Sequence, residues 1–338
     1  MQNFEYANPG TLAEATGLLG ATWDDAAILA GGTDLLSLMK DYRMTPKRVV
    51  NIKSIKGLDK VSKSGGGLSV GAAVTVDDFM ENAAVRAEYP SLVQAAHGIT
   101  SPQIRNMGTL AGDLCQRPRC WYFRNGYGLL GMQDGKSLID AGENRYHAIF
   151  PQGAAKFVSA SSFAPALIAL GAKLKITGKS GNREVALADF FVAPKSDTER
   201  EIALKPDEIV TEIMIPSAGG AKNATYEVRQ KDALDWPLAT ASVVLKMNGK
   251  AVTSAKIVMG HVGPTPVSAD KAAAWLVGKT ITAETAEAAG KAAVESAMPL
   301  SQNAYKVQLA KVAVKRALMM AAGLSVSRWH CGTAAIRS

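Results

Sequence analysis

Residues 29–36 read Leu-Ala-Gly-Gly-Thr-Asp-Leu-Leu, and this stretch decides how the first part of the chain folds. An apolar run over 27–30 predicts a buried strand that enters a tight loop at the two glycines. Residues 34–40 then have a helical pattern. Glycines let backbone N–H groups approach a phosphate closely, and a helix start adds a favourable dipole, so the loop suits a pyrophosphate. A plain strand-to-helix turn capped by Thr33 is the alternative, because the spacing is not the G-x-G-x-x-G of a Rossmann fold.

A second loop of small and hydroxyl residues lies at 106–113, which reads Asn-Met-Gly-Thr-Leu-Ala-Gly-Asp. One glycine-rich loop is a weak indication of a phosphate site. Two such loops in one chain could hold a single diphosphate from both sides. The pair therefore favours a dinucleotide over two unrelated turns.

The chain on either side of these loops predicts an α+β fold. Thr11, with Glu14 three residues later, begins a helix with a capping box. Residues 217–220, Ser-Ala-Gly-Gly, are the best linker candidate, and the turn at Asn248-Gly249 is expected to be longer than a minimal hairpin. Strands are expected at 48–52, 68–71, 173–177, 209–215, 224–228, 239–247 and 255–259, and helices at 91–96, 164–170, 270–276, 283–297 and 305–320.

The composition is that of an ordinary globular protein. The 338 residues are 47% apolar and 20% charged, with a net charge of +8. No run approaches the roughly 18 apolar residues of a membrane span. Residues 1–10 lack the pattern of a secretory signal, so we expect a cytoplasmic protein. The lysines are dispersed and no nucleic-acid-binding motif accompanies them, so we expect no nucleic acid partner.

Five motifs together resemble one known family. They are 30–36, 108–113, 187–191, 204–209 with 215–216, and 259–266, in the family's order and spacing. On these residues the chain resembles the FAD-binding subunit of the molybdenum hydroxylases, the group of xanthine dehydrogenase, aldehyde oxidase and carbon monoxide dehydrogenase. The resemblance runs from about residue 1 to 323. Each motif alone is unspecific, but the ordered set is specific.

The resemblance implies a PCMH-type two-lobed FAD-binding domain, followed by a C-terminal domain of antiparallel strands plus three helices. It also implies an irregular insertion in the second lobe and a short tail, which we expect to be disordered. The predicted boundaries are 1–57 and 58–216 for the two lobes of the FAD-binding domain (1–216), 115–155 for the insertion, 222–323 for the C-terminal flavoprotein domain and 324–338 for the tail.

The resemblance also implies the cofactor, FAD, and the residues that hold it. Ile209 would lie against the isoalloxazine ring, with a core isoleucine as the alternative. Lys231 would bring positive charge near the ring, with a surface lysine as the alternative. Trp236 stands at the family position beside the flavin, where we expect core packing. The predicted cofactor-binding set is Ala30, Gly31, Gly32, Thr33, Asp34, Leu35, Asn106, Gly108, Thr109, Ala111, Gly112, Asp113, Ile209 and Lys231.

Three residues depart from the family pattern. Ala111 stands where relatives usually have glycine, and its methyl group could crowd the diphosphate. Asp113 stands where they usually have asparagine, and its carboxylate would repel a diphosphate unless it points away or meets Arg105. Phe163 lies in 161–163, where relatives often have Pro-Ser-Asp, and it cannot supply the carboxylate contact of that aspartate.

The insertion carries Cys115 and Cys120, and Cys331 lies in the tail. Some relatives bind a [4Fe–4S] cluster in this insertion through four cysteines, the usual requirement for such a cluster. Cys120 matches the start of that pattern, but the remaining cysteines are replaced. We therefore expect no [4Fe–4S] cluster and no other metal site, and we expect Cys115 and Cys120 to be ordinary buried thiols.

Arg105, Arg117, Arg119 and Arg124 form a basic stretch around the second loop. They could contact the FAD phosphates or an iron–sulfur partner subunit, and a solvated face is the alternative. Aromatic residues at 121–123 favour a contact between subunits.

No general acid–base pair or nucleophile stands out, and His97 and His147 are isolated in the sequence. This pattern fits an oxidoreductase subunit that relays electrons. By resemblance, a large subunit with the molybdenum cofactor oxidises the substrate, and a small [2Fe–2S] subunit passes electrons to this FAD. The FAD then reduces an external acceptor, which is NAD, a quinone, oxygen or a protein. A self-contained FAD-dependent oxidoreductase and a flavin-free scaffold subunit are the alternatives.

Overall fold

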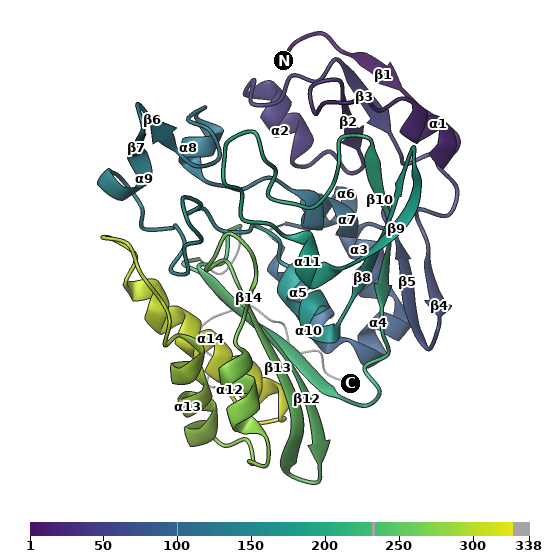
Figure 1. Ribbon diagram of the computed structural model, residues 1–338. Helices are drawn as coiled ribbons and strands as arrows, with labels where there is room; N and C mark the ends of the chain where they lie inside the picture. The colour runs from purple at the N-terminus through teal and green to yellow at the C-terminus, as the bar shows by residue number, and fades with distance from the viewer. Residues whose placement is uncertain (100, 232–233, 327–338) are drawn as a thin grey trace.

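The computed structural model describes residues 1–99, 101–231 and 234–326. Within them, a small parallel sheet, a five-stranded antiparallel sheet and a four-stranded antiparallel sheet form the framework, and helices cover each sheet (Figure 1). The predicted α+β fold class is confirmed. No helix of the described residues is both long enough and apolar enough to cross a membrane.

The first lobe is built on three parallel strands in the order β1-β3-β2. Thr11 caps α1 as predicted, because its Oγ1 accepts the N–H of Glu14 at 3.2 Å. The Glu14 carboxylate reaches the N–H of Gly10 at 2.8 Å and not that of Thr11, so the capping box is displaced by one residue. The elements are β1 (Glu5–Ala7), α1 (Leu12–Gly17), β2 (Ala26–Leu29), α2 (Leu35–Lys40) and β3 (Arg48–Asn51).

The second lobe surrounds an antiparallel sheet in the order β4-β5-β10-β8-β9. Alternate residues of its strands, including Val70, Leu174 and Ile213, are fully buried under the helices. Its strands are β4 (Val61–Ser64), β5 (Gly67–Gly71), β8 (Lys173–Gly178), β9 (Gly181–Ala186) and β10 (Glu208–Ile215). Its helices are α3 (Val76–Glu81), α4 (Ala83–Glu88), α5 (Pro90–Gly98), α6 (Pro102–Met107), α7 (Leu110–Cys115), α10 (Ala164–Leu170) and α11 (Leu187–Phe190).

The predicted insertion has only short elements and a small apolar core of its own. Leu129, Leu130, Ala155 and Phe157 form that core, with Cys120 packed against it. Figure 1 shows the insertion projecting beside the first lobe and above the C-terminal helices. Its elements are α8 (Trp121–Arg124), β6 (Met132–Gln133), β7 (Lys136–Ser137) and α9 (Leu138–Ala141).

The C-terminal part is a four-stranded antiparallel sheet in the order β11-β12-β13-β14, with three helices as predicted. The hairpin prediction was wrong. Asn248 pairs directly with Ala251, so the loop has the minimal length, because β13 begins earlier than its apolar residues indicated. The elements are β11 (Lys222–Val228), β12 (Ala239–Asn248), β13 (Ala251–Gly260), β14 (Val267–Ser268), α12 (Asp270–Leu276), α13 (Ala283–Ala293) and α14 (Tyr305–Ala321).

This last sheet joins the two halves of the molecule. Helix α14 packs on β11 and β12, whereas α5 and α10 of the second lobe pack on the same sheet from the other half (Figure 1). The contact between the halves uses polar side chains: Asn223 Oδ1 accepts the N–H of Ser91 at 2.9 Å, and Gln94 Oε1 accepts that of Thr225 at 2.7 Å. These buried hydrogen bonds fix how the C-terminal domain lies against the lobes.

Candidate functional site

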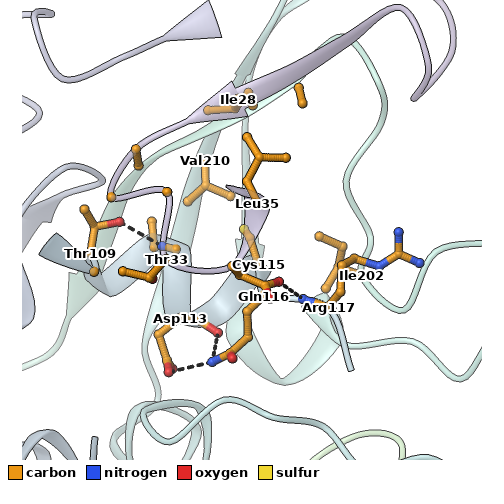
Figure 2. A pocket seen from close by; sticks show the side chains of 18 of the residues that line it. Ile28, Thr33, Leu35, Thr109, Asp113, Cys115, Gln116, Arg117, Ile202 and Val210 are labelled. Carbon is orange, nitrogen blue, oxygen red and sulfur yellow. Dashed lines mark hydrogen bonds between the residues drawn. The ribbon is translucent and has the colours of Figure 1, made fainter. Parts of the chain in front are cut away.

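One deep pocket lies where the first lobe, the second lobe and the C-terminal part meet. It encloses about 1550 Å³ of space, open solvent at its mouth included. Figure 2 shows side chains from β2, the loop before α2, α7 and β10 directed into it. The walls are largely apolar, with charged side chains gathered on one side, as is typical of sites for an amphipathic ligand.

The two glycine loops touch each other at this pocket. A Cβ atom on Gly31 would lie 1.9 Å from the carbonyl oxygen of Met107, so only glycine permits the approach. Gly32 has a φ of +75°, which also favours glycine. A Cβ on Gly108 would lie 3.4 Å from Thr33 Oγ1. The glycines therefore serve first to bring the two loops together, and the joined loops form the pocket wall.

The second loop is fixed by its own hydrogen bonds. Thr109 Oγ1 caps α7 by accepting the N–H of Gly112 at 3.0 Å. The backbone of Gly108 accepts the N–H of Val76 at 2.9 Å, and the N–H of Leu110 reaches Val74 at 3.0 Å. These bonds tie the loop to the start of α3 and hold its geometry without a ligand.

Asp34, at the end of the first loop, forms hydrogen bonds and ion pairs with arginine residues of the insertion. Its Oδ2 accepts the backbone N–H of Arg117 at 2.8 Å, and its Oδ1 accepts Nη2 of Arg124 at 2.8 Å. Arg119 Nη1 lies 3.4 Å from the same Oδ1. The side chains of Arg117 and Arg124 are only 14% and 16% exposed. A solvated face for this basic stretch is therefore wrong, because the arginines turn inward.

Asp113 also lines the pocket, and it does not meet Arg105. Arg105 Nε lies 3.5 Å from Asp77 instead. The Asp113 carboxylate accepts hydrogen bonds from the Ser161 hydroxyl and, at 3.3 and 3.2 Å, from the backbone N–H groups of Ser162 and Phe163. It thus points away from the first loop, toward the turn before α10. Burial raises the pKa of Asp113 to about 6, although these hydrogen bonds lower it.

Within residues 161–163, Ser162 and not Phe163 lines the pocket. Phe163 is fully buried and packs edge-on against Phe79, with ring centroids 5.8 Å apart. Phe163 therefore lies in the core, and its side chain does not take the place of the aspartate that relatives often have. The 161–163 turn still reaches a carboxylate, that of Asp113, through its backbone.

Most of the predicted cofactor residues meet at this one pocket. Asn106 and Lys231 do not line it: Asn106 donates to the carbonyl oxygen of Pro102, and Lys231 is exposed. Ile209 is 1% exposed and belongs both to the wall and to the core of the first lobe. The predicted residues at the pocket are Ala30, Gly31, Gly32, Thr33, Asp34, Leu35, Gly108, Thr109, Ala111, Gly112, Asp113 and Ile209.

Sequence reasoning missed several residues of the wall and misjudged one. Arg200 lies over the Trp23 ring at 4.2 Å, and both line the pocket, but neither belongs to a recognisable motif. Trp236 was expected in the core. It is 37% exposed and lines the pocket, with the Arg119 guanidinium 4.5 Å from its ring centre. Its neighbour Pro237 lies in the same wall, so this stretch of the chain reaches the pocket, at the position that the resemblance places beside the flavin.

The two described cysteines have separate surroundings. Cys115 is half-buried in the pocket wall, and desolvation raises the pKa of its thiol to about 12. Cys120 Sγ lies 3.3 Å from His147 Nε2, so His147, although isolated in the sequence, has a close partner in space. Burial, with nearby Lys306, lowers the pKa of His147 to about 4. Among the described residues no group of three or more potential ligands could hold a metal ion, and Cys331 lies outside them.

Comparison with known families identifies the chain through both of its halves. Residues 2–218 match the FAD-binding domain in molybdopterin dehydrogenase, and residues 224–321 match the CO dehydrogenase flavoprotein C-terminal domain. The chain belongs to this flavoprotein family. It is an FAD-binding, electron-transfer subunit of a molybdenum hydroxylase, and therefore part of an oxidoreductase.

Individual relatives cover nearly the whole flavoprotein subunit. This chain is 31% identical to the aldehyde oxidoreductase FAD-binding subunit PaoB of Escherichia coli, over 92% of this chain and 96% of the relative. It is 30% identical to the carbon monoxide dehydrogenase medium chain of Hydrogenophaga pseudoflava, over 93% and 96%. Quinoline 2-oxidoreductase from Pseudomonas putida 86 is a similar solved structure, with a TM-score of 0.75 and 26% identity over 95% of this chain and 98% of that one. Each relative thus shares both halves of the subunit and the joint between them.

Proposed function

We propose that this subunit holds one FAD in the pocket between the two glycine loops and passes electrons from a small [2Fe–2S] subunit through that FAD to an external acceptor. The observation that carries the proposal is the direct contact of Gly31 with Met107, which joins the two loops into one wall. The predicted boundaries, 1–216 and 222–323, and the predicted cofactor set are part of the proposal.

The chain's own residues bind, orient and shield the cofactor. The loops at 30–35 and 108–113 would face the diphosphate, and Ile209 would lie against the isoalloxazine ring. Trp236 and Pro237 close the wall from the C-terminal part. FAD supplies the redox chemistry when it is bound, while the protein sets its position and its access to water. Lys231 is exposed and does not line the pocket, and its predicted positive charge near the ring remains part of the proposal.

The proposed partner subunits are inferred from the names of this chain's relatives. Relatives are named as medium chains and as FAD-binding subunits of multi-subunit enzymes, which supports a large molybdenum-cofactor subunit and a small [2Fe–2S] subunit as partners here. Trp121 is 41% exposed, and the centroid of its ring lies 5.7 Å from that of Tyr146. Exposed aromatic side chains of this kind are common in the contacts between subunits. We keep this part of the insertion as the predicted subunit contact, and the cytoplasm as the predicted location.

Purification of the native complex tests the proposal. We expect the chain to elute with two further subunits and to carry bound flavin with its visible absorption bands. Addition of the substrate of the complex should bleach those bands, because electrons reach the FAD from the partner subunits. A chain that is fully active alone would support a self-contained oxidoreductase instead. A chain that takes up no flavin after reconstitution would support a scaffold subunit.

A further inference from the structure

A cluster of guanidinium groups lines one side of the pocket. We define the arginine cluster as Arg117, Arg119, Arg124 and Arg200, together with the carboxylates Asp34 and Glu201. Arg117 Nε and Glu201 Oε1 are 2.5 Å apart, and Arg200 Nε lies 3.5 Å from Glu201 Oε2. Both contacts are ion pairs between a guanidinium group and the buried Glu201 carboxylate.

The arginine cluster carries excess positive charge. It contains four guanidinium groups and two carboxylates. Asp113 adds a third carboxylate to the pocket wall, but it bonds to the 161–163 turn and to none of these arginines. Arginine side chains remain charged even when they are buried. Among the residues that the structure describes, the four guanidinium groups outnumber these three carboxylates by one, and an excess charge of this kind is costly unless a ligand balances it.

Three of the four guanidinium groups are held in place. Arg124 donates to Asp34 and to two backbone carbonyl groups, and Arg117 pairs with Glu201. Arg200 pairs with Glu201 and lies over Trp23. Their positions are thus determined by the protein, and their charge contributes to the potential in the pocket.

Arg119 differs because most of its donors have no close acceptor. Its Nη1 and Nη2 lie 3.4 Å from Asp34 Oδ1 and Gln116 Oε1, which are long contacts. Its Nε is buried and has no hydrogen-bond partner among the residues that the structure describes. The guanidinium rests on the Trp236 ring and lines the pocket next to the end of the first glycine loop. A group so placed can offer its donors to an anion held by that loop.

We propose that Arg119 binds the diphosphate of FAD and that Asp34 positions Arg119, so that the insertion supplies the counter-charge for the diphosphate at the two glycine loops. This inference rests on the proposed binding of FAD. It changes the expected role of Asp34, whose carboxylate holds the arginine cluster and does not itself contact the cofactor. Arginine suits this role because its planar donors match phosphate oxygens two at a time.

The test compares three ligands that contain different parts of FAD. Isothermal titration of the full-length apo chain with FAD, with ADP and with riboflavin gives three dissociation constants. The variant Arg119→Gln removes the charge and leaves a shorter, neutral polar side chain. Arg119→Lys restores the charge without the planar donors. Arg145→Gln is the matched control, because Arg145 belongs to the same insertion, pairs with Glu143 and is 51% exposed away from this pocket.

We expect Arg119→Gln to weaken FAD and ADP binding by roughly tenfold or more, since a charge-assisted hydrogen bond is lost, and to leave riboflavin binding unchanged. Arg119→Lys should lose less affinity than Arg119→Gln, and Arg145→Gln should leave all three dissociation constants unchanged. Equal weakening of riboflavin, or no change for ADP, would overturn the inference. Thermal unfolding without ligand separates a folding defect from a binding defect. A wild-type chain that binds neither FAD nor ADP would overturn the proposed function as well.

Discussion

At the scale of single residues, Asp113 shows how one substitution changes the chemistry of a pocket. Its carboxylate lies in a wall that we propose faces a diphosphate, and burial raises its pKa to about 6 from the usual 3.8. Bonds to Ser161, Ser162 and Phe163 hold it away from the first loop. Arg119, Glu227 and Cys115 are the titratable groups that interact with it electrostatically. The charged carboxylate therefore lowers the free energy of unfolding, and we expect it also to weaken the proposed binding of an anion at this wall.

The pH dependence of stability tests this description. The folded state binds the Asp113 proton more tightly than the unfolded state, so the unfolding free energy contributed by this group falls as pH rises from about 4 to about 6. Well above pH 6, the ionised carboxylate lowers the free energy of unfolding by its full amount. Asp113→Asn should therefore stabilise the protein more at pH 7.5 than at pH 4.5, by about 2 kcal/mol, because about 1 kcal/mol of the full effect of about 3 kcal/mol is already present at pH 4.5. Urea unfolding at both values measures the difference, with the exposed Asp189→Asn as a control that should show none.

The same variant should bind ADP more tightly at neutral pH. Removal of a negative charge from the wall of an anion site is worth on the order of 1 kcal/mol, or roughly fivefold in affinity. The advantage should shrink below pH 6, where Asp113 of the wild-type protein takes up a proton. Titration calorimetry with ADP at pH 5.5 and pH 8 measures both values. An advantage of equal size at the two pH values would contradict the assignment of the charge to Asp113.

At the scale of elements, the pocket depends on the contact between two loops. Gly31 approaches the carbonyl oxygen of Met107 at the end of α6, and Thr109 fixes the start of α7. The two loops belong to different lobes, and each is attached to its own sheet. Their contact therefore sets the distance between the lobes at the place where the ligand is proposed to bind.

Gly31→Ala should separate the loops. The new methyl group would lie 1.9 Å from a backbone oxygen, which cannot move as a flexible side chain would. We expect a loss of FAD and ADP affinity of at least tenfold and a destabilisation of about 1–3 kcal/mol, typical of overpacking. Gly17→Ala is the matched control in the same lobe, because its Cβ would meet nothing within 4 Å. Unchanged ADP affinity in Gly31→Ala would show that the loop contact does not shape the site.

At the scale of the whole molecule, the insertion is fastened to the C-terminal domain. Lys306 of α14 is 1% exposed, and its Nζ donates to the carbonyl oxygens of Tyr146, His147 and His261. Asn303 Nδ2 also donates to His147, at 3.1 Å. These bonds hold the end of the insertion against the last helix. The same insertion carries three members of the arginine cluster, Arg117, Arg119 and Arg124.

Lys306→Met should loosen this attachment. It removes three hydrogen bonds and leaves buried carbonyl oxygens without donors, so we expect a loss of about 2–4 kcal/mol in unfolding free energy. Lys315→Met on the same helix is the control, because Glu287 keeps its other partner, Lys311; its effect should stay below about 1 kcal/mol. Hydrogen exchange should show faster exchange over residues 115–155 in Lys306→Met alone. Unchanged exchange there would contradict the anchoring role.

The sequence by itself determined the local parts of this protein. Hydrophobic periods and glycine signals located the strands at 173–177 and 209–215, the helix at 164–170 and both loops of the pocket. Such patterns depend on neighbours along the chain, so they can be read without a fold. The order of the motifs was sufficient to predict the family and its cofactor.

Only the tertiary structure decided where the charged side chains point. The sequence left open whether Asp113 points away or meets Arg105, and only the fold turns it toward Ser161. Nothing in the sequence indicated that Arg117 and Arg124 reach Asp34. Residues 115–155 have no sustained period, so their path depends on contacts such as those of Lys306, which come from the far end of the chain. A side chain in a loop takes its direction from long-range partners that no local pattern encodes.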